Sequence, residues 1–191
     1  MRHHTRMLVL VLFVLAAVPA GVAVAKKAPI NLSGTSWYAD VAGQLKVQKL
    51  GSEKYTTGLE LYLGPISDPY VVDAGEFLIV DDDNNQYTGT WSDPKGNGSL
   101  VTQMDADSLA ALHDSLVDDL SDALDQNLVG QITPGSVWVT ITGVKLQIKL
   151  QPGKAGSLSM TVNFTGGATV DGEAQTGKGS MTAKGKVAQE V

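Results

Sequence analysis

The sequence has 191 residues, with 14 Lys and Arg against 20 Asp and Glu and a formal net charge of −6. It contains no cysteine, which excludes disulfides and cysteine nucleophiles, and its only arginines are Arg2 and Arg6. Guanidinium groups make most bidentate contacts to phosphates and guanine, so this acidic, arginine-poor chain is not expected to bind nucleic acid. The apolar share of 43% is enough for a hydrophobic core.

Residues 1–25 are predicted to form a secretory signal peptide. A start with two arginines precedes an apolar run at residues 7–18, and Ala23 and Ala25 place small side chains before the cleavage point. We expect Lys26 to be the first mature residue, with an earlier cut after Ala20 as the alternative. The apolar run is shorter than the ~20 residues of a membrane-spanning helix, so no transmembrane anchor is expected after processing. Export of a cysteine-free chain is typical of bacteria, which predicts a periplasmic or secreted protein.

Residues 26–191 are expected to form one β-rich domain. We place a first group of strands in residues 26–104, a helix in residues 105–130 and a second group of strands in residues 131–191. The predicted fold class is mainly β: an antiparallel barrel or strongly bent sheet of eight to ten strands, with one amphipathic helix inserted mid-chain.

The strands of the first group are indicated by alternation. Residues 44–48 and 59–63 alternate between apolar and polar side chains, which is typical of half-buried strands. Residues 77–80 are instead a continuous apolar run, which predicts a strand covered on both faces. Glycine, proline and aspartate clusters between these segments indicate turns.

The helix is indicated by leucines that recur at steps of three or four residues, which places them on one helical face. They are Leu109, Leu112, Leu116, Leu120, Leu124 and Leu128. We predict a helix over residues 106–128, capped at its start by Asp105 or Asp107 and ended by Gly130. Four aspartates fall opposite the leucines and predict a solvated face. They are Asp114, Asp118, Asp122 and Asp125.

The second strand group contains a break in its alternation. Val139 and Ile141 share one phase, whereas the apolar residues of 144–150 follow the other. The slip at Gly143 predicts a β-bulge that bends a long strand. Later segments offer only small side chains for an outer face and lack aromatic girdles, so a soluble barrel is favoured over a membrane barrel.

His113 is the only histidine after the leader. At 100° per residue it lies about 20° from Leu120, inside the leucine stripe. Two interpretations remain open: a hydrogen-bonded core histidine, or a polar group facing a cavity as ligand contact or general base. Burial of the ring should depress its pKa unless a carboxylate also reaches it. A single histidine excludes two-histidine zinc sites, and no Gly-x-Ser-x-Gly turn is present.

Asp81, Asp83 and Asn85 have the alternating spacing of a calcium loop. That loop requires glycine at its sixth position and glutamate at its twelfth, where this sequence has Gln86 and Ser92. The three residues remain a weak calcium candidate. An acidic hairpin tip is favoured, and no metal is expected.

Two tryptophans suggest where a ligand would bind. A shift of 101 residues superimposes Trp37 on Trp138 and matches the strand patterns that follow each, which suggests an internal repeat. Separately from the repeat, Trp37, Trp138 and His113 are the candidate ligand-binding residues, and no catalytic residue is assigned.

The favoured function is that of an exported, non-catalytic protein that holds a small, largely apolar ligand in a β-barrel, without a cofactor. The alternative is a structural or protein-interaction component of the bacterial cell envelope, whose acidic face contacts an envelope protein. The third hypothesis is a hydrolase that uses His113 with a carboxylate.

Overall fold

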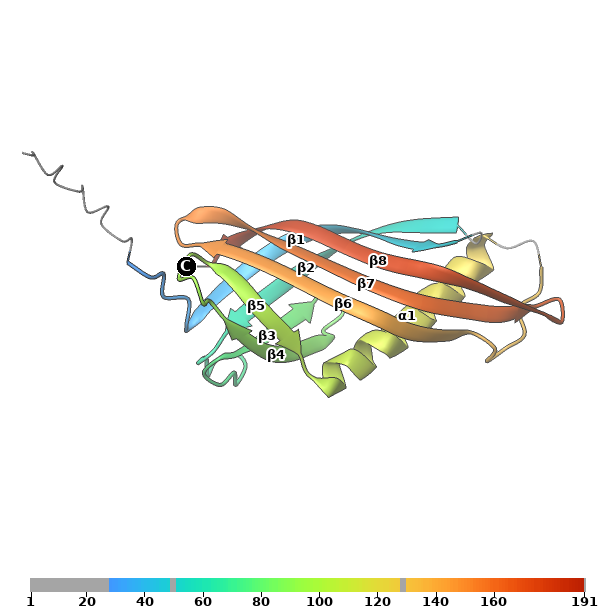
Figure 1. Ribbon diagram of the computed structural model, residues 1–191, viewed down its shortest axis with the longest axis horizontal. Coiled ribbons are helices and arrows are strands. Elements are labelled where there is room, and N and C mark those ends of the chain that lie inside the picture. The colour runs from blue at the N-terminus through green and yellow to red at the C-terminus, as the bar shows by residue number, and fades with distance from the viewer. Residues whose placement is uncertain (1–27, 49–50, 128–129, 191) are drawn as a thin grey trace, which may run out of the picture.

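The computed structural model describes residues 28–48, 51–127 and 130–190. Eight antiparallel strands, each paired with its neighbours in sequence order and β8 with β1, form a closed barrel with one mid-chain helix (Figure 1). This confirms the predicted fold class. The elements are β1 (Thr35–Val47), β2 (Gly51–Leu63), β3 (Glu76–Asp81), β4 (Gln86–Ser92), β5 (Ser99–Met104), α1 (Ala106–Asn127), β6 (Trp138–Gln151), β7 (Lys154–Val170) and β8 (Glu173–Gln189). The predicted signal peptide lies outside the described residues.

Unequal strand lengths divide the barrel into two halves. β3, β4 and β5 have six or seven residues, whereas the other strands have 13 to 17. As a result, β2 pairs with β3 only over Leu59–Leu63, and β5 pairs with β6 only through Ser99 and Leu100. Helix α1 crosses the remaining half of the long strands and contacts β2, β4 and β6 (Figure 1). In that half the helix takes the place of barrel wall.

The leucine stripe attaches α1 to the inside of the sheet. Leu112, Leu116, Leu120 and Leu124 are all buried and share a core cluster with residues of β1, β6, β7 and β8. These four leucines confirm the predicted buried face. Leu109 at the start of the stripe is 36% exposed, because it lies where β5 and β6 diverge, and Leu128 lies outside the described residues.

Asp105 caps the first turn of α1 and also ties it to β4. Its carboxylate accepts a hydrogen bond from the Ser108 amide at 2.8 Å and another from the Thr88 hydroxyl, while the Thr88 amide donates to Ser108 Oγ at 2.6 Å. Burial works to raise the pKa of Asp105, but the hydrogen bonds from Thr88 and Ser108 outweigh it and lower the pKa. The predicted cap is confirmed.

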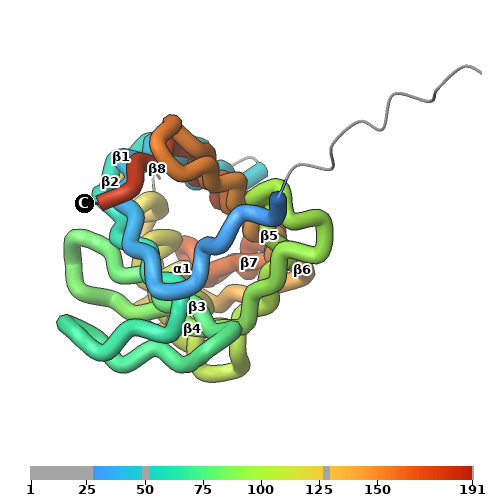
Figure 2. Tube along the Cα trace, turned by 90° about the vertical axis from the view of Figure 1, so that its left-hand side faces the viewer, coloured from blue at the N-terminus to red at the C-terminus, as the bar shows by residue number. Residues whose placement is uncertain are grey.

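A second core cluster fills the other half of the barrel, where the wall consists of strands alone. It includes Trp37, Phe77 and Leu150, all fully buried. Residues 28–34 run across this end, and Leu32 is buried in the same cluster (Figure 2). This end of the barrel is therefore filled and covered.

Two further predictions for single strands are confirmed. All of residues 77–80 in β3 are buried, with Phe77 and Ile79 in the barrel and Leu78 and Val80 in a small outer cluster. The register of β6 against β7 shifts between Ile141 and Gly143, at the predicted bulge.

In the described part of the chain, no helix is long and apolar enough to cross a membrane.

Candidate functional site

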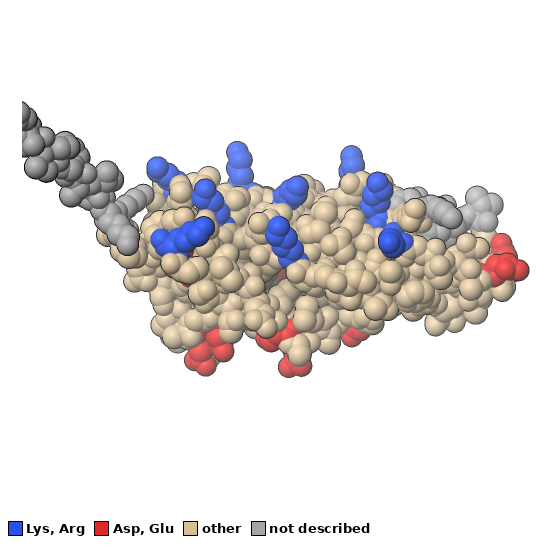
Figure 3. All heavy atoms as spheres, in the orientation of Figure 1, with Lys and Arg blue, Asp and Glu red and all other residues tan. Residues whose placement is uncertain are grey.

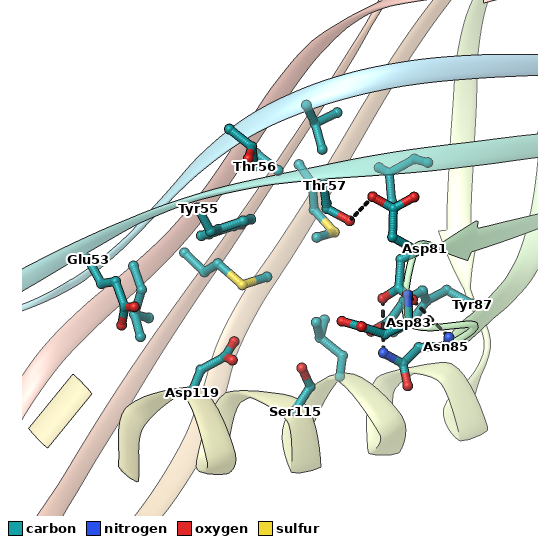
Figure 4. A pocket seen from close by; sticks show the side chains of 18 of the residues that line it. Glu53, Tyr55, Thr56, Thr57, Asp81, Asp83, Asn85, Tyr87, Ser115 and Asp119 are labelled. Atoms are coloured by element: carbon teal, nitrogen blue, oxygen red, sulfur yellow. Dashed lines mark hydrogen bonds between the residues drawn. The ribbon is translucent and has the colours of Figure 1, made fainter. Parts of the chain in front are cut away.

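A cavity of about 390 Å³ opens where the short strand β3 ends, beside the middle of α1. Its mouth is framed by the half of β2 that does not pair with β3, by the β3–β4 turn at residues 81–85 and by one side of α1 (Figure 4). The gap follows from the strand lengths, because β2 continues for eight residues beyond its pairing with β3. Solvent can therefore enter the barrel at this point.

The floor of the cavity is apolar. It lies between the two core clusters and is formed by side chains of β1, β2, β7, β8 and α1 that point into the barrel. These residues are Val41, Leu45, Leu59, Leu112, Met160, Met181 and Ala183. The unbranched Met side chains can adjust to ligands of different shape.

Tyr55 forms one side of the cavity, and its position depends on Gly43. The two residues pair across β1 and β2, and a Cβ atom at Gly43 would lie 2.1 Å from the Tyr55 ring. The ring therefore lies over Gly43, and its hydroxyl donates to the Thr182 carbonyl of β8 at 3.2 Å. Burial, with a smaller contribution from the charge of Asp119, raises the pKa of Tyr55 to about 12.

Six carboxylates line the mouth, and two of them have structural partners. The Asp82 carboxylate accepts a hydrogen bond from the Gly58 amide at 2.6 Å, which joins the β3–β4 turn to β2. The Asp81 carboxylate accepts from the amides of Asp83 and Asn85 and from the Asn85 side chain, all within 3.0 Å. These two residues shape the mouth.

The other four carboxylates come from three elements and face one another without a partner. Within the described residues, no hydrogen bond or ion pair is formed by the carboxylates of Glu53 in β2, Asp83 in the turn, or Asp119 and Asp122 in α1. Glu53 and Asp119 extend into the mouth from opposite sides, one from β2 and the other from α1 (Figure 4). Desolvation by the surrounding protein, then the charges of Glu53 and Asp122, raise the pKa of Asp119.

Comparison with protein-family models, curated proteins and solved structures finds no match. The function must therefore be argued from the cavity itself.

The three predicted ligand-binding residues have different surroundings, and none of them lines this cavity. Trp37 is fully buried in the strand-walled half, where its Nε1 donates to Thr35 Oγ1 at 2.8 Å. Trp138 is 42% exposed at the start of β6. Because one tryptophan points into the barrel and the other does not, the two do not occupy equivalent positions.

His113 is not a core residue, and its pKa is not depressed, because a carboxylate reaches the ring. Its side chain is 43% exposed; Nδ1 contacts the Asp114 carboxylate and Nε2 the Val139 carbonyl, each at 3.0 Å. Both partners are acceptors, so only the doubly protonated ring satisfies both. Asp114 and then Val139 accordingly raise the pKa of His113. The helical periodicity predicted the correct side of α1. At this position along the helix, however, the ring contacts the part of β6 that does not pair with β5.

The calcium candidate has a different role in the structure. Both carboxylate oxygens of Asp81 accept hydrogen bonds within the turn, from Asp83 and Asn85, as in an acidic hairpin tip. Within the described ranges, no group of three or more acidic or histidine side chains is placed to hold a metal ion.

Sequence reasoning missed Asp119, Glu53 and Tyr55 as site residues. For Asp119 a signal was present: it lies seven residues after Leu112, about 20° away on the wheel, and so borders the leucine stripe. For Glu53 and Tyr55 no local signal exists, because their exposure to the cavity depends on where β3 stops pairing with β2.

Proposed function

We propose that this chain is an exported, non-catalytic binding protein that holds a small, largely apolar ligand in the cavity beside β2. The observation that supports this proposal most directly is an apolar floor that borders a cavity open to the outside. Val41, Leu112 and Ala183 are nearly inaccessible yet border a cavity of about 390 Å³. That volume falls within the range of roughly 300–1,000 Å³ typical of small-molecule sites.

A second hollow, between β5 and β6, is a weaker candidate. It is lined by Leu109, Ile141 and Val144 among others, and it is a groove open to solvent along the seam of the barrel. A ligand there would keep much of its surface in water. The cavity beside β2 can enclose more of an apolar ligand, and the hydrophobic gain scales with the area removed from water.

Export is part of the proposal and is supported by the leader-like residues 1–25 of the sequence. Intact-mass analysis of protein secreted by its source should give a chain that starts at Lys26 or Gly21. Full-length protein retained in the cytoplasm would contradict it.

Binding can be tested with N-phenyl-1-naphthylamine, an uncharged probe whose fluorescence rises in apolar surroundings. The wild type should bind it saturably. Ala183→Leu adds apolar volume to the cavity floor and should weaken binding at least tenfold. Ala188→Leu makes the same change on the same strand, at an exposed position, and should leave binding unchanged.

Thermal melts of both variants separate loss of binding from loss of folding. If Ala183→Leu does not fold, Ala183→Val provides a smaller filling substitution. A wild type that does not bind the probe would refute the ligand-binding proposal, and equal binding by both variants would place the ligand elsewhere.

A further inference from the structure

We propose that the ligand of this cavity is an amphiphilic organic cation, with its apolar part on the barrel floor and its ammonium group among Glu53, Asp83 and Asp119 at the mouth. This inference rests on the proposed binding function and specifies the chemical class of ligand. It is carried by the cavity, whose two ends differ in chemistry.

The first argument is the composition of the mouth. Four carboxylates from β2, the β3–β4 turn and α1 border it without a partner, and no lysine is among the described residues that line it. The exposed lysines of β6 and β8 lie on the outer face of the sheet, whereas acidic side chains lie along the opposite edge (Figure 3). These lysines are Lys145, Lys149, Lys178, Lys184 and Lys186. The mouth is therefore an uncompensated negative region.

The second argument is the depth at which the charge stops. The carboxylates occupy only the mouth, and the floor consists of aliphatic and Met side chains. A small inorganic cation would leave this floor empty, and the described residues form no cluster suited to a metal. A ligand with a charged end and an apolar body satisfies both regions.

The third argument concerns two tyrosines of the cavity. Tyr55 and Tyr87 line it together with the carboxylates, and both phenols are neutral at pH 7, since burial raises the pKa of each further above its usual value. Aromatic faces attract ammonium groups, and quaternary ammonium ions are commonly bound beside them. An anionic ligand would be repelled by the carboxylates, and no cationic side chain is among the described residues that line the cavity.

The test compares three ligands with the same eight-carbon chain and different ends: octyltrimethylammonium, 1-octanol and octanoate. Each is titrated into the full mature chain by calorimetry at pH 7 and low salt, and by displacement of N-phenyl-1-naphthylamine. We expect octyltrimethylammonium to bind at least tenfold more tightly than octanol, and octanoate more weakly than both. The preference for the cation should decline as sodium chloride is added.

Two matched variants locate the effect. Asp119→Asn removes one charge from the mouth and should reduce the preference for octyltrimethylammonium over octanol at least threefold, with octanol affinity unchanged. Asp125→Asn removes the same charge from an exposed position of α1 that does not line the cavity, and should leave the preference intact.

The outcomes separate this inference from the proposed function. Equal affinity for octanol and octyltrimethylammonium, or tighter binding of octanoate, overturns the inference and leaves apolar binding in place. No binding of any of these ligands or of the probe refutes both. Equal effects of the two variants would assign the preference to overall charge and overturn the site. Displacement of octyltrimethylammonium by micromolar calcium would make the mouth a metal site and overturn the inference.

Discussion

Gly43 should be required because the Tyr55 ring occupies the space of a side chain. A Cβ atom at this position would lie 2.1 Å from the ring, far inside van der Waals contact, and 2.5 Å from the hydroxyl oxygen. Gly43→Ala must therefore displace the ring and break its hydrogen bond to the Thr182 carbonyl. Overpacking of this kind costs about 1–3 kcal/mol. The displaced ring should also weaken binding of N-phenyl-1-naphthylamine, because Tyr55 lines the cavity.

A double-mutant cycle isolates the contact between the two residues. With Tyr55→Ala in place the obstruction is gone, and Gly43→Ala should become neutral or stabilising by up to about 1 kcal/mol, since alanine restricts the unfolded chain more than glycine. The sign of the effect should therefore reverse between the two backgrounds. Urea denaturation followed by tryptophan fluorescence and circular dichroism supplies the free energies.

Gly143→Ala is the matched control for this cycle. A Cβ atom at Gly143 would meet nothing within 4 Å, so the substitution should likewise be neutral or stabilising by up to about 1 kcal/mol. An equal cost for Gly43→Ala with and without Tyr55 would show that the cost has another source, and the described position of the ring would be wrong.

Four other substitutions test the helix and its charges. Leu116→Ala should lower the free energy of unfolding by about 3–5 kcal/mol, because it opens a void under α1. Leu109→Ala, at a partly exposed position, should lower it by about 1 kcal/mol. Both values come from urea denaturation, and equal costs would contradict the assigned buried face. The contacts of His113 contribute fully below its unfolded pKa of about 6.5 and are lost as pH rises through its raised folded pKa. The difference in unfolding free energy between wild type and His113→Leu should therefore fall from about pH 6 to about pH 8, by less than about 1 kcal/mol for so exposed a ring, and a difference that grows would refute the sign. Folding raises the pKa of Asp119 and so disfavours its ionised form, but the side chain is exposed and solvent screens its charge, so Asp119→Asn should stabilise the protein at pH 7 by no more than about 0.5 kcal/mol. That gain should disappear as pH falls through the folded pKa toward the unfolded value, and a destabilised variant at pH 7 would show that the carboxylate has an attractive partner.

The fold could be predicted because its signals are local and periodic. Alternation in β1 and the leucine spacing of α1 each identify one buried face, and the slip at Gly143 marks the bulge in β6. Turn residues between the strands then favour antiparallel neighbours. Each of these inferences needs only residues within about twenty positions of one another.

The site could not be predicted in the same way, because it lies where elements end. The cavity exists because β3 stops pairing at Leu59 of β2, and no local pattern gives the length of a strand pairing. His113 shows the same limit from the helix: its angle on the wheel is correct, but its height along α1 places it at the edge of β6. Tyr55 requires a cross-strand glycine at Gly43, which only the register of β1 and β2 reveals.

The mouth is also where stability and the proposed binding oppose each other, and Ser115 offers a way to measure this. Ser115 lines the cavity one helical turn before Asp119, so Ser115→Lys would bring an ammonium group among the unpartnered carboxylates. The fold should then gain about 0.5 kcal/mol at pH 7, lost at high salt, while affinity for octyltrimethylammonium falls at least tenfold and that for octanol changes little. Asp125→Lys changes the net charge of the protein at least as much, but from outside the cavity. It should have little effect on the affinity for octyltrimethylammonium or on the preference for it over octanol. Unchanged cation binding in Ser115→Lys would mean that the ammonium group of the ligand lies elsewhere.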